Sequence, residues 1–271
     1  MNAEDALYLQ TVLDPIGVCA HYRPKFGQGA KGNGLTLEQF RTLYQGDAFY
    51  NWFGLDNPLM YAAHKAAGGM TSVYRQIGIG CERLFRTILR DSLGLSAIDV
   101  TWSYKILLDS GKTRKLSLDG RVPLDKIKDN VKRDRFHSWM LETAKRGGVN
   151  PNIANTLTGT VFEVRQGYKS KDAKRQNADI TNASNAYAEA YFPCAVILSA
   201  QIDGDILLRY RAERWAVLIG IIGANDPLNS TYDFMRDIVG YDLAAFFQRN
   251  SQTLRTEIDA ILKALLAPET T

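Results

Sequence analysis

Cysteine is scarce in this sequence, and its few cysteines are widely separated. The chain of 271 residues contains three, at Cys19, Cys81 and Cys194. No two of them form a Cys-x-x-Cys pair, and no Cys/His pattern with zinc-ligand spacing is present. A disulfide framework and a zinc-binding module are therefore not expected. An odd number of distant cysteines is typical of reduced thiols, as in a cytoplasmic protein.

Long hydrophobic runs are also missing. The longest apolar stretch, residues 215–223, is much shorter than the roughly 20 residues that span a bilayer. Residues 1–5 are polar and have no basic segment followed by an apolar one, which argues against a secretory signal peptide. The sequence therefore predicts a protein that does not enter a membrane.

Charge of one sign is only slightly in excess. The formal net charge is +4, with 45% hydrophobic and 23% charged residues, which is an ordinary globular composition. A mild positive excess weakly favours an anionic partner. The length suits one large domain or two small ones. We interpret residues 1–271 as a single domain, with a helical region at 1–71, a core at about 72–200 and a helical region at 224–271.

The spacing of apolar residues predicts alternating helices and strands. Residues 72–93 repeat with the helical period, and the Gly68-Gly69 pair before them is expected to break the helical pattern. Residues 99–122 are rich in β-formers on both sides of a turn and predict a hairpin. The other expected elements are strands at 160–165, 194–200 and 215–222, and helices within 123–150, 170–191 and 231–266. This order predicts an α/β fold with a mixed central β-sheet flanked by helices.

The strand at 160–165 carries a carboxylate and a cation on the same face. Because side chains alternate along a strand, Val161, Glu163 and Arg165 share one face, and Phe162 and Val164 share the other. A carboxylate supplies the hard oxygen ligands that Mg²⁺ prefers. A neighbouring cation can hold a water molecule or a phosphate. The strand therefore predicts half of a site for phosphate chemistry.

A second carboxylate is needed on an adjacent strand, and Asp119 is the best candidate. It lies near the end of the predicted hairpin beside Gly120, where the backbone can turn. Glu82, on the preceding helix, could add an outer ligand or a water anchor. Each acid also has a purely structural interpretation. Asp119 could be a turn residue, Glu163 could form an ion pair, and Glu82 could be a solvated helix residue.

This order of elements is similar to the core of the PD-(D/E)XK nuclease superfamily. A helix with Glu82, a hairpin with Asp119, a strand with Glu163-x-Arg165, a helix and a buried strand follow one another over about residues 72–200. The whole chain resembles a type II restriction endonuclease. Leu118-Asp119 stands where that family has Pro-Asp, and Arg165 stands where it has Lys. Arginine cannot lose its proton, so it cannot serve as a general base.

The resemblance implies Mg²⁺-dependent cleavage of double-stranded DNA at a short site, by a homodimer that acts with a cognate DNA methyltransferase. The implied catalytic residues are Asp119, Glu163, Arg165 and Lys169, with Asp119 and Glu163 as the metal ligands. Lys171 is an alternative source of the amine. The basic helix start after the strand predicts contacts to DNA through Lys171, Lys174, Arg175, Gln176 and Asn177. Further basic residues at 112–135 would line a DNA groove. The alternatives are a non-catalytic nucleic-acid-binding protein and an α/β enzyme acting on a small molecule.

Overall fold

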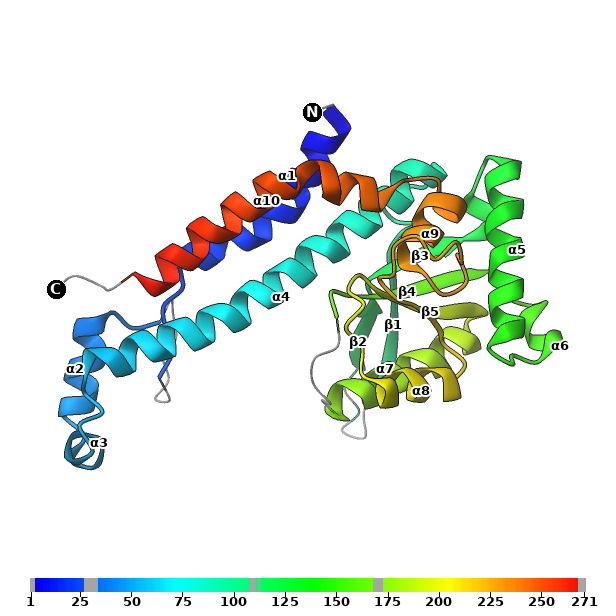
Figure 1. The fold of residues 1–271 in the computed structure, drawn as a ribbon. Helices are drawn as coiled ribbons and strands as arrows, with labels where there is room; N and C mark the ends of the chain where they lie inside the picture. The colour runs from blue at the N-terminus through cyan, green and yellow to red at the C-terminus, as the bar shows by residue number, and fades with distance from the viewer. Residues whose placement is uncertain (1–2, 27–33, 108–110, 112, 168–172, 268–271) are drawn as a thin grey trace. The chain divides into compact units, whose positions relative to one another are not determined.

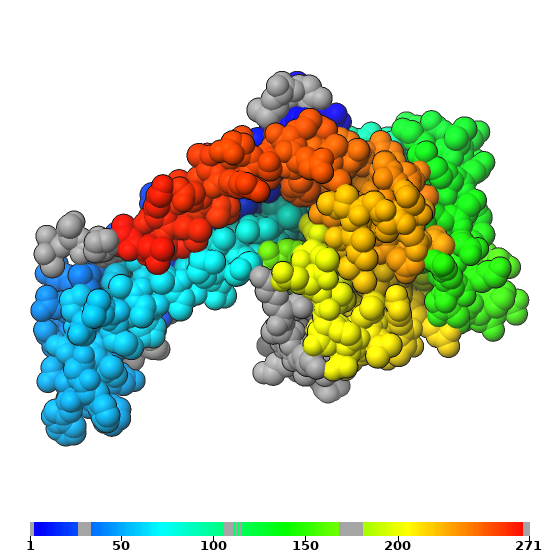
Figure 2. Space-filling model, viewed as in Figure 1, coloured from blue at the N-terminus to red at the C-terminus, as the bar shows by residue number. Residues whose placement is uncertain are grey.

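The chain forms two compact units, which Figure 1 shows in ribbon form and Figure 2 as a space-filling model. The computed structural model describes residues 3–26, 34–107, 111, 113–167 and 173–267. Unit 1 comprises Met1–Gly80 and Arg249–Thr271, and unit 2 comprises Cys81–Gln248. The two units are described separately, and the interpretation of residues 1–271 as one domain stays a prediction. None of the described helices has the length and apolarity needed to cross a membrane.

Unit 1 is helical. It contains α1 (Ala3–Gly17), the 3-10 helix η1 (Val18–His21), α2 (Leu37–Gln45), α3 (Ala48–Trp52) and parts of α4 (Pro58–Leu93) and α10 (Leu243–Leu266). Thr36 begins α2 with a capping box, since its hydroxyl accepts from the Gln39 N–H and the Gln39 side chain accepts from the Thr36 N–H. Aromatic side chains of Phe26, Phe40 and Tyr61 form a buried cluster in this unit.

The glycine pair at Gly68-Gly69 does not interrupt the helix, so the expected break is wrong. Helix α4 runs without interruption from Pro58 to Leu93. A Cβ on Gly68 would collide with the Tyr22 hydroxyl, and one on Gly69 would collide with the Leu265 side chain. The two glycines therefore allow neighbouring segments of unit 1 to pack closely against the helix, and this packing compensates for their low helix propensity.

Unit 2 is built around β-strands. Strands β1 (Trp102–Leu107) and β2 (Thr113–Leu118) form an antiparallel pair, which confirms the predicted hairpin. A second sheet has the order β3-β4-β5-β6, from β3 (Gly120–Pro123), β4 (Gly159–Arg165), β5 (Tyr191–Ile197) and β6 (Ala216–Leu218). β3 is antiparallel to β4, whereas β4, β5 and β6 are parallel. The protein is thus mixed α/β with a mixed sheet, as predicted.

Helices connect and cover these strands. They are η2 (Leu124–Lys126), α5 (Asn130–Arg146), α6 (Pro151–Ala154), α7 (Ala173–Ala188), α8 (Gly204–Ala212), α9 (Thr231–Asp233) and the π-helix η3 (Phe234–Val239). On one face of the sheet, Val161 of β4 packs in a buried cluster with Ala183 of α7 and Ile206 of α8. Figure 1 shows these two helices next to each other along the strands. On the other face, the ring of Phe162 lies 5.2 Å from Phe85 of α4 and 6.0 Å from Phe234. The predicted alternation along β4 is therefore confirmed.

Several element boundaries differ from the prediction. Strand β5 begins at Tyr191 rather than 194, and β6 ends at Leu218 rather than 222. Just after the end of β6, the backbone at Gly220 passes so close to the Leu198 carbonyl that a side chain would collide with it. The helical region predicted at 231–266 is divided at Gly240, whose φ of 93° is left-handed and ends the π-helix before α10 begins.

Candidate functional site

The chain bends at Asp119, the single residue between β2 and β3. β2 pairs with β1, whereas β3 pairs with β4, so the strand partner changes at this residue. Gly120 is registered opposite Phe162 of β4. The residue before Gly120 therefore lies beside the residue after Phe162, which places the backbone of Asp119 next to that of Glu163 of β4.

Two hydrogen bonds hold Asp119 in this place. Its backbone N–H donates to the Phe162 carbonyl over 2.8 Å. Its carboxylate oxygen Oδ2 accepts from the Val164 N–H, also over 2.8 Å. Both bonds reach the residues that flank Glu163. The local fold of the strands therefore places the backbone of Asp119 beside that of Glu163.

Glu163 and Arg165 form an ion pair on β4. The Glu163 carboxylate contacts the Arg165 guanidinium, and their side chains are only 8% and 14% exposed. A pair so removed from water interacts strongly, because little solvent screens the two charges. The pairing of Glu163 and Arg165 on one strand face agrees with the sequence-based prediction. Arg165 carries a permanent positive charge at this position.

Helix α4 contributes a second acid and a second arginine. Glu82 forms an ion pair with Arg86, one helical turn further along, and the Arg86 Nε donates to the Asp119 carbonyl over 2.8 Å. Arg86 therefore joins the helix to the strand bend. The sequence analysis did not name Arg86. Its i,i+4 spacing from Glu82 was the available signal, although such pairs are common on helix surfaces.

The electrostatics at Asp119 are unusual for an aspartate. Its pKa is raised from 3.8 to about 6, first because burial removes water from the carboxylate and then because the Glu82 charge lies nearby. The Val164 N–H, Arg165 and Arg86 favour the ionised form and partly offset these effects. The charge of Glu82 thus acts on Asp119, while its role as an outer ligand or water anchor stays a prediction.

Two of the residues at this site carry carboxylates, the ligand type of a hard cation. A buried carboxylate whose pKa is raised by a second acid is an arrangement that a bound cation stabilises, because the cation offsets both the burial and the repulsion. Asp119 and Glu163 supply the oxygen ligands that Mg²⁺ prefers. Within the described ranges, however, no three His, Cys, Asp or Glu side chains form a group that could hold a metal ion. The contacts of the two carboxylates include the Arg165 guanidinium for Glu163 and the Val164 N–H for Asp119.

The other predicted site residues lie at the start of α7 or before it. Lys169 and Lys171 are outside the described residues. The backbone of α7 includes four more of the predicted DNA contacts, whose side chains are also outside the described part: Lys174, Arg175, Gln176 and Asn177. In the basic segment 112–135, some cations support the fold. Arg121 donates to the carbonyls of Asp99 and Ile98, and Lys132 donates to that of Ser92.

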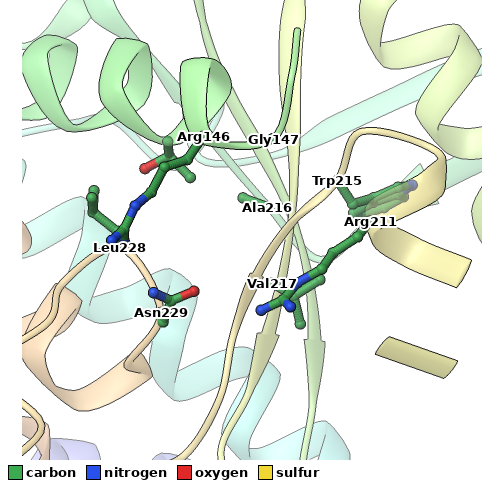
Figure 3. A pocket seen from close by; sticks show the side chains of 9 residues that line it. Arg146, Gly147, Arg211, Trp215, Ala216, Val217, Leu228 and Asn229 are labelled. Carbon is green, nitrogen blue, oxygen red and sulfur yellow. The ribbon is translucent and has the colours of Figure 1, made fainter. Parts of the chain in front are cut away.

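A pocket of about 320 Å³ lies at β6, the edge of the sheet opposite β3. Figure 3 shows Arg146 from the end of α5 and Arg211 from the end of α8 on its two sides, with Asn229 between them. Arg146 is 3.6 Å from the carboxylate of Asp226. No sequence motif pointed to this pocket, because its lining comes from four separate segments of unit 2.

No family model, curated protein or solved structure matches this chain. The function proposed below therefore depends on the geometry and chemistry of this chain's own residues.

Proposed function

We propose that this chain is a Mg²⁺-dependent endonuclease that hydrolyses phosphodiester bonds in double-stranded DNA, of the type II restriction kind and with a PD-(D/E)XK-like core. One observation carries the proposal. The backbone of Asp119, at the bend between β2 and β3, lies beside that of Glu163 of β4, and the half-buried cation Arg165 pairs with Glu163. Two carboxylates could hold a metal ion for phosphate hydrolysis, and a neighbouring cation could stabilise the phosphate charge.

Each residue has a role that follows from its contacts. Asp119 and Glu163 would hold the metal through carboxylate oxygens. When bound, Mg²⁺ polarises the scissile phosphate and lowers the pKa of the attacking water. Arg165 remains charged throughout and stabilises the negative charge that develops on the phosphate. Arg86 holds Glu82 and the Asp119 carbonyl, so it positions the acids rather than reacting. Lys169 remains a proposed source of an amine.

The remaining parts of the proposal concern partners and location. A short palindromic target would be read by a homodimer, because the two-fold symmetry of such DNA matches a two-fold protein. A cognate DNA methyltransferase would protect the host's own sites. The three cysteines are free and buried, which suits a reducing compartment, and we propose the cytoplasm.

The first experiment is cleavage of supercoiled plasmid in Mg²⁺, with the protein and its Glu163→Gln variant. We expect discrete fragments from the parent and at least a 100-fold loss in the variant, since about 2.7 kcal/mol of transition-state stabilisation corresponds to this factor. Glu142→Gln, which changes an exposed acid on α5, is the matched control and should cut like the parent. Equal cutting by parent and Glu163→Gln would overturn the proposal.

A second candidate is a nucleic-acid-binding protein without catalysis. The observation that favours it is the pairing of both Glu82 and Glu163 with arginines, which is also the arrangement of a structural ion-pair network. This candidate predicts a gel shift of duplex DNA in EDTA, no strand cleavage with any divalent cation, and unchanged DNA affinity after Glu163→Gln.

A further inference from the structure

The loops after the three parallel strands form one continuous rim. The rim is defined here as residues 165–167 at the end of β4, 198–201 after β5 and 220–225 after β6. In the parallel register, Glu163 of β4 is level with Ala195 of β5 and Val217 of β6. The rim therefore begins at the end of the strands that carries Glu163 and Arg165.

Backbone contacts join the three segments of the rim. The Leu198 N–H donates to the Arg165 carbonyl, the Ser199 N–H donates to the Gln166 carbonyl, and the Gly220 N–H donates to the Ser199 carbonyl. A Cβ on Gly167 would lie 3.2 Å from that of Ser199, so the first two segments are also in close approach. The rim is one surface rather than three independent loops.

The third segment is well anchored although its side chains are exposed. The Ser230 hydroxyl donates to the Ile221 carbonyl over 2.6 Å, and the Ile219 N–H donates to the Asn229 carbonyl over 2.7 Å. Ile221 and Ile222 are nevertheless 45% and 61% exposed. The backbone that presents these apolar side chains is thus fixed by hydrogen bonds. The segment 220–225 lies at the surface in the gold region of Figure 2.

The chemistry of the rim is neutral and suited to hydrogen bonding. Its 13 residues contain no acid and one cation, Arg165. Gln201 and Asn225 are exposed and present carboxamides, and Ile222 presents an exposed apolar group. Carboxamides pair with adenine edges in the major groove, and apolar groups contact the thymine methyl. An acid-free surface does not repel phosphates.

We propose that this rim reads the base sequence of the duplex DNA, with Gln201 and Asn225 bonding base edges and Ile222 contacting a thymine methyl. The inference depends on the proposed function, because it takes duplex DNA as the ligand. Adjacent strands lie about 4.8 Å apart, so β6 is roughly 10 Å from β4. At about 3.4 Å per base pair, the third segment would read bases roughly three pairs from the phosphate at Glu163.

The test selects bound sequences from a pool of randomised DNA duplexes in Ca²⁺, with sequencing of the bound fraction. Selection needs binding but no cleavage, so it is independent of the plasmid assay. We expect the parent to enrich one short motif. Gln201→Ala and Asn225→Ala should each lose preference at one base pair by at least tenfold, while Ile222→Ala should lose preference at a thymine. Circular dichroism checks that each variant is folded.

Matched controls are Gln252→Ala and Asn152→Ala, which remove exposed carboxamides outside the rim and should enrich the parent's motif. Rim variants that enrich the same motif as the parent would overturn the inference, even if the plasmid assay shows cleavage. A parent that enriches no motif would overturn it as well. A parent that enriches a motif lost in the rim variants, but cuts no plasmid with Mg²⁺, would support the rim and contradict the nuclease.

Discussion

The two edges of the four-stranded sheet each have an aspartate near an arginine, and the two aspartates behave in opposite ways. At the β3 edge, burial and the Glu82 charge raise the pKa of Asp119 to about 6. At the β6 edge, a hydrogen bond from Asn229 lowers the pKa of the more exposed Asp226, with Arg146 contributing. An aspartate near an arginine thus has a lowered pKa at one edge and a raised pKa at the other. Burial is the leading cause of the raised pKa at Asp119, whereas a hydrogen bond is the leading cause of the lowered pKa at Asp226.

The largest expected effect is on the rate of DNA cleavage, and it distinguishes the β3 edge from the β6 edge. Asp119→Asn should reduce plasmid cleavage in Mg²⁺ by about 1,000-fold, because losing a metal ligand costs several kcal/mol of transition-state stabilisation. Asp226→Asn should leave the rate within about twofold. Initial rates on supercoiled plasmid measure both variants. An Asp119→Asn protein that cuts as fast as Asp226→Asn would remove the functional difference between the edges.

The pH dependence of stability is the next largest effect. Because the pKa of Asp119 is raised in the folded state, the folded protein retains a proton that the unfolded chain has already lost between about pH 4 and pH 6. The free energy of unfolding should therefore fall across this window as pH rises. Across this pH window, the free energy of unfolding of the parent should fall by about 3 kcal/mol more than that of Asp119→Asn. Urea unfolding at several pH values measures the difference, and parallel curves for the two proteins would contradict it.

At the β6 edge, the close approach of Gly220 to Leu198 predicts a smaller loss of stability. Gly220→Ala should lower the free energy of unfolding by about 2 kcal/mol, because the added methyl meets backbone atoms that cannot move aside easily. Gly204→Ala is the control, since open space surrounds that position. Thermal unfolding of both variants gives the comparison, and equal midpoints would show that the loop moves to accommodate the methyl.

The smallest effect concerns the influence of α4 on the β3 edge. Glu82→Gln removes the charge that raises the pKa of Asp119, and it releases Arg86 to stabilise the ionised form. The pKa of Asp119 should fall by about one unit. NMR titration of the carboxyl carbon measures it directly. The exposed Glu142→Gln variant should retain the parent's titration midpoint, and a midpoint unmoved by Glu82→Gln would exclude this charge as a cause.

Much of the fold followed from local patterns. The alternation at 160–165 placed Glu163 and Arg165 on one face, and the turn between two β-rich segments predicted the β1–β2 hairpin. The continuity of α4 through Gly68-Gly69 was not predictable, because it depends on Tyr22 and Leu265, which are distant in sequence. The role of Arg86 and the pocket at β6 were missed for the same reason. Local patterns indicate which side chains share a face, but not which distant segments meet.

The hydrogen bond from the Val164 N–H to the Asp119 carboxylate gives this protein a built-in reporter. The chemical shift of a backbone amide that donates to a carboxylate changes when the charge on that oxygen changes. Protonation of Asp119, or its engagement by an ion, would therefore alter the resonance of one peptide group inside the sheet. The ionisation state of Asp119 can therefore be followed through the NMR resonance of the Val164 amide, without a substituted residue or a substrate.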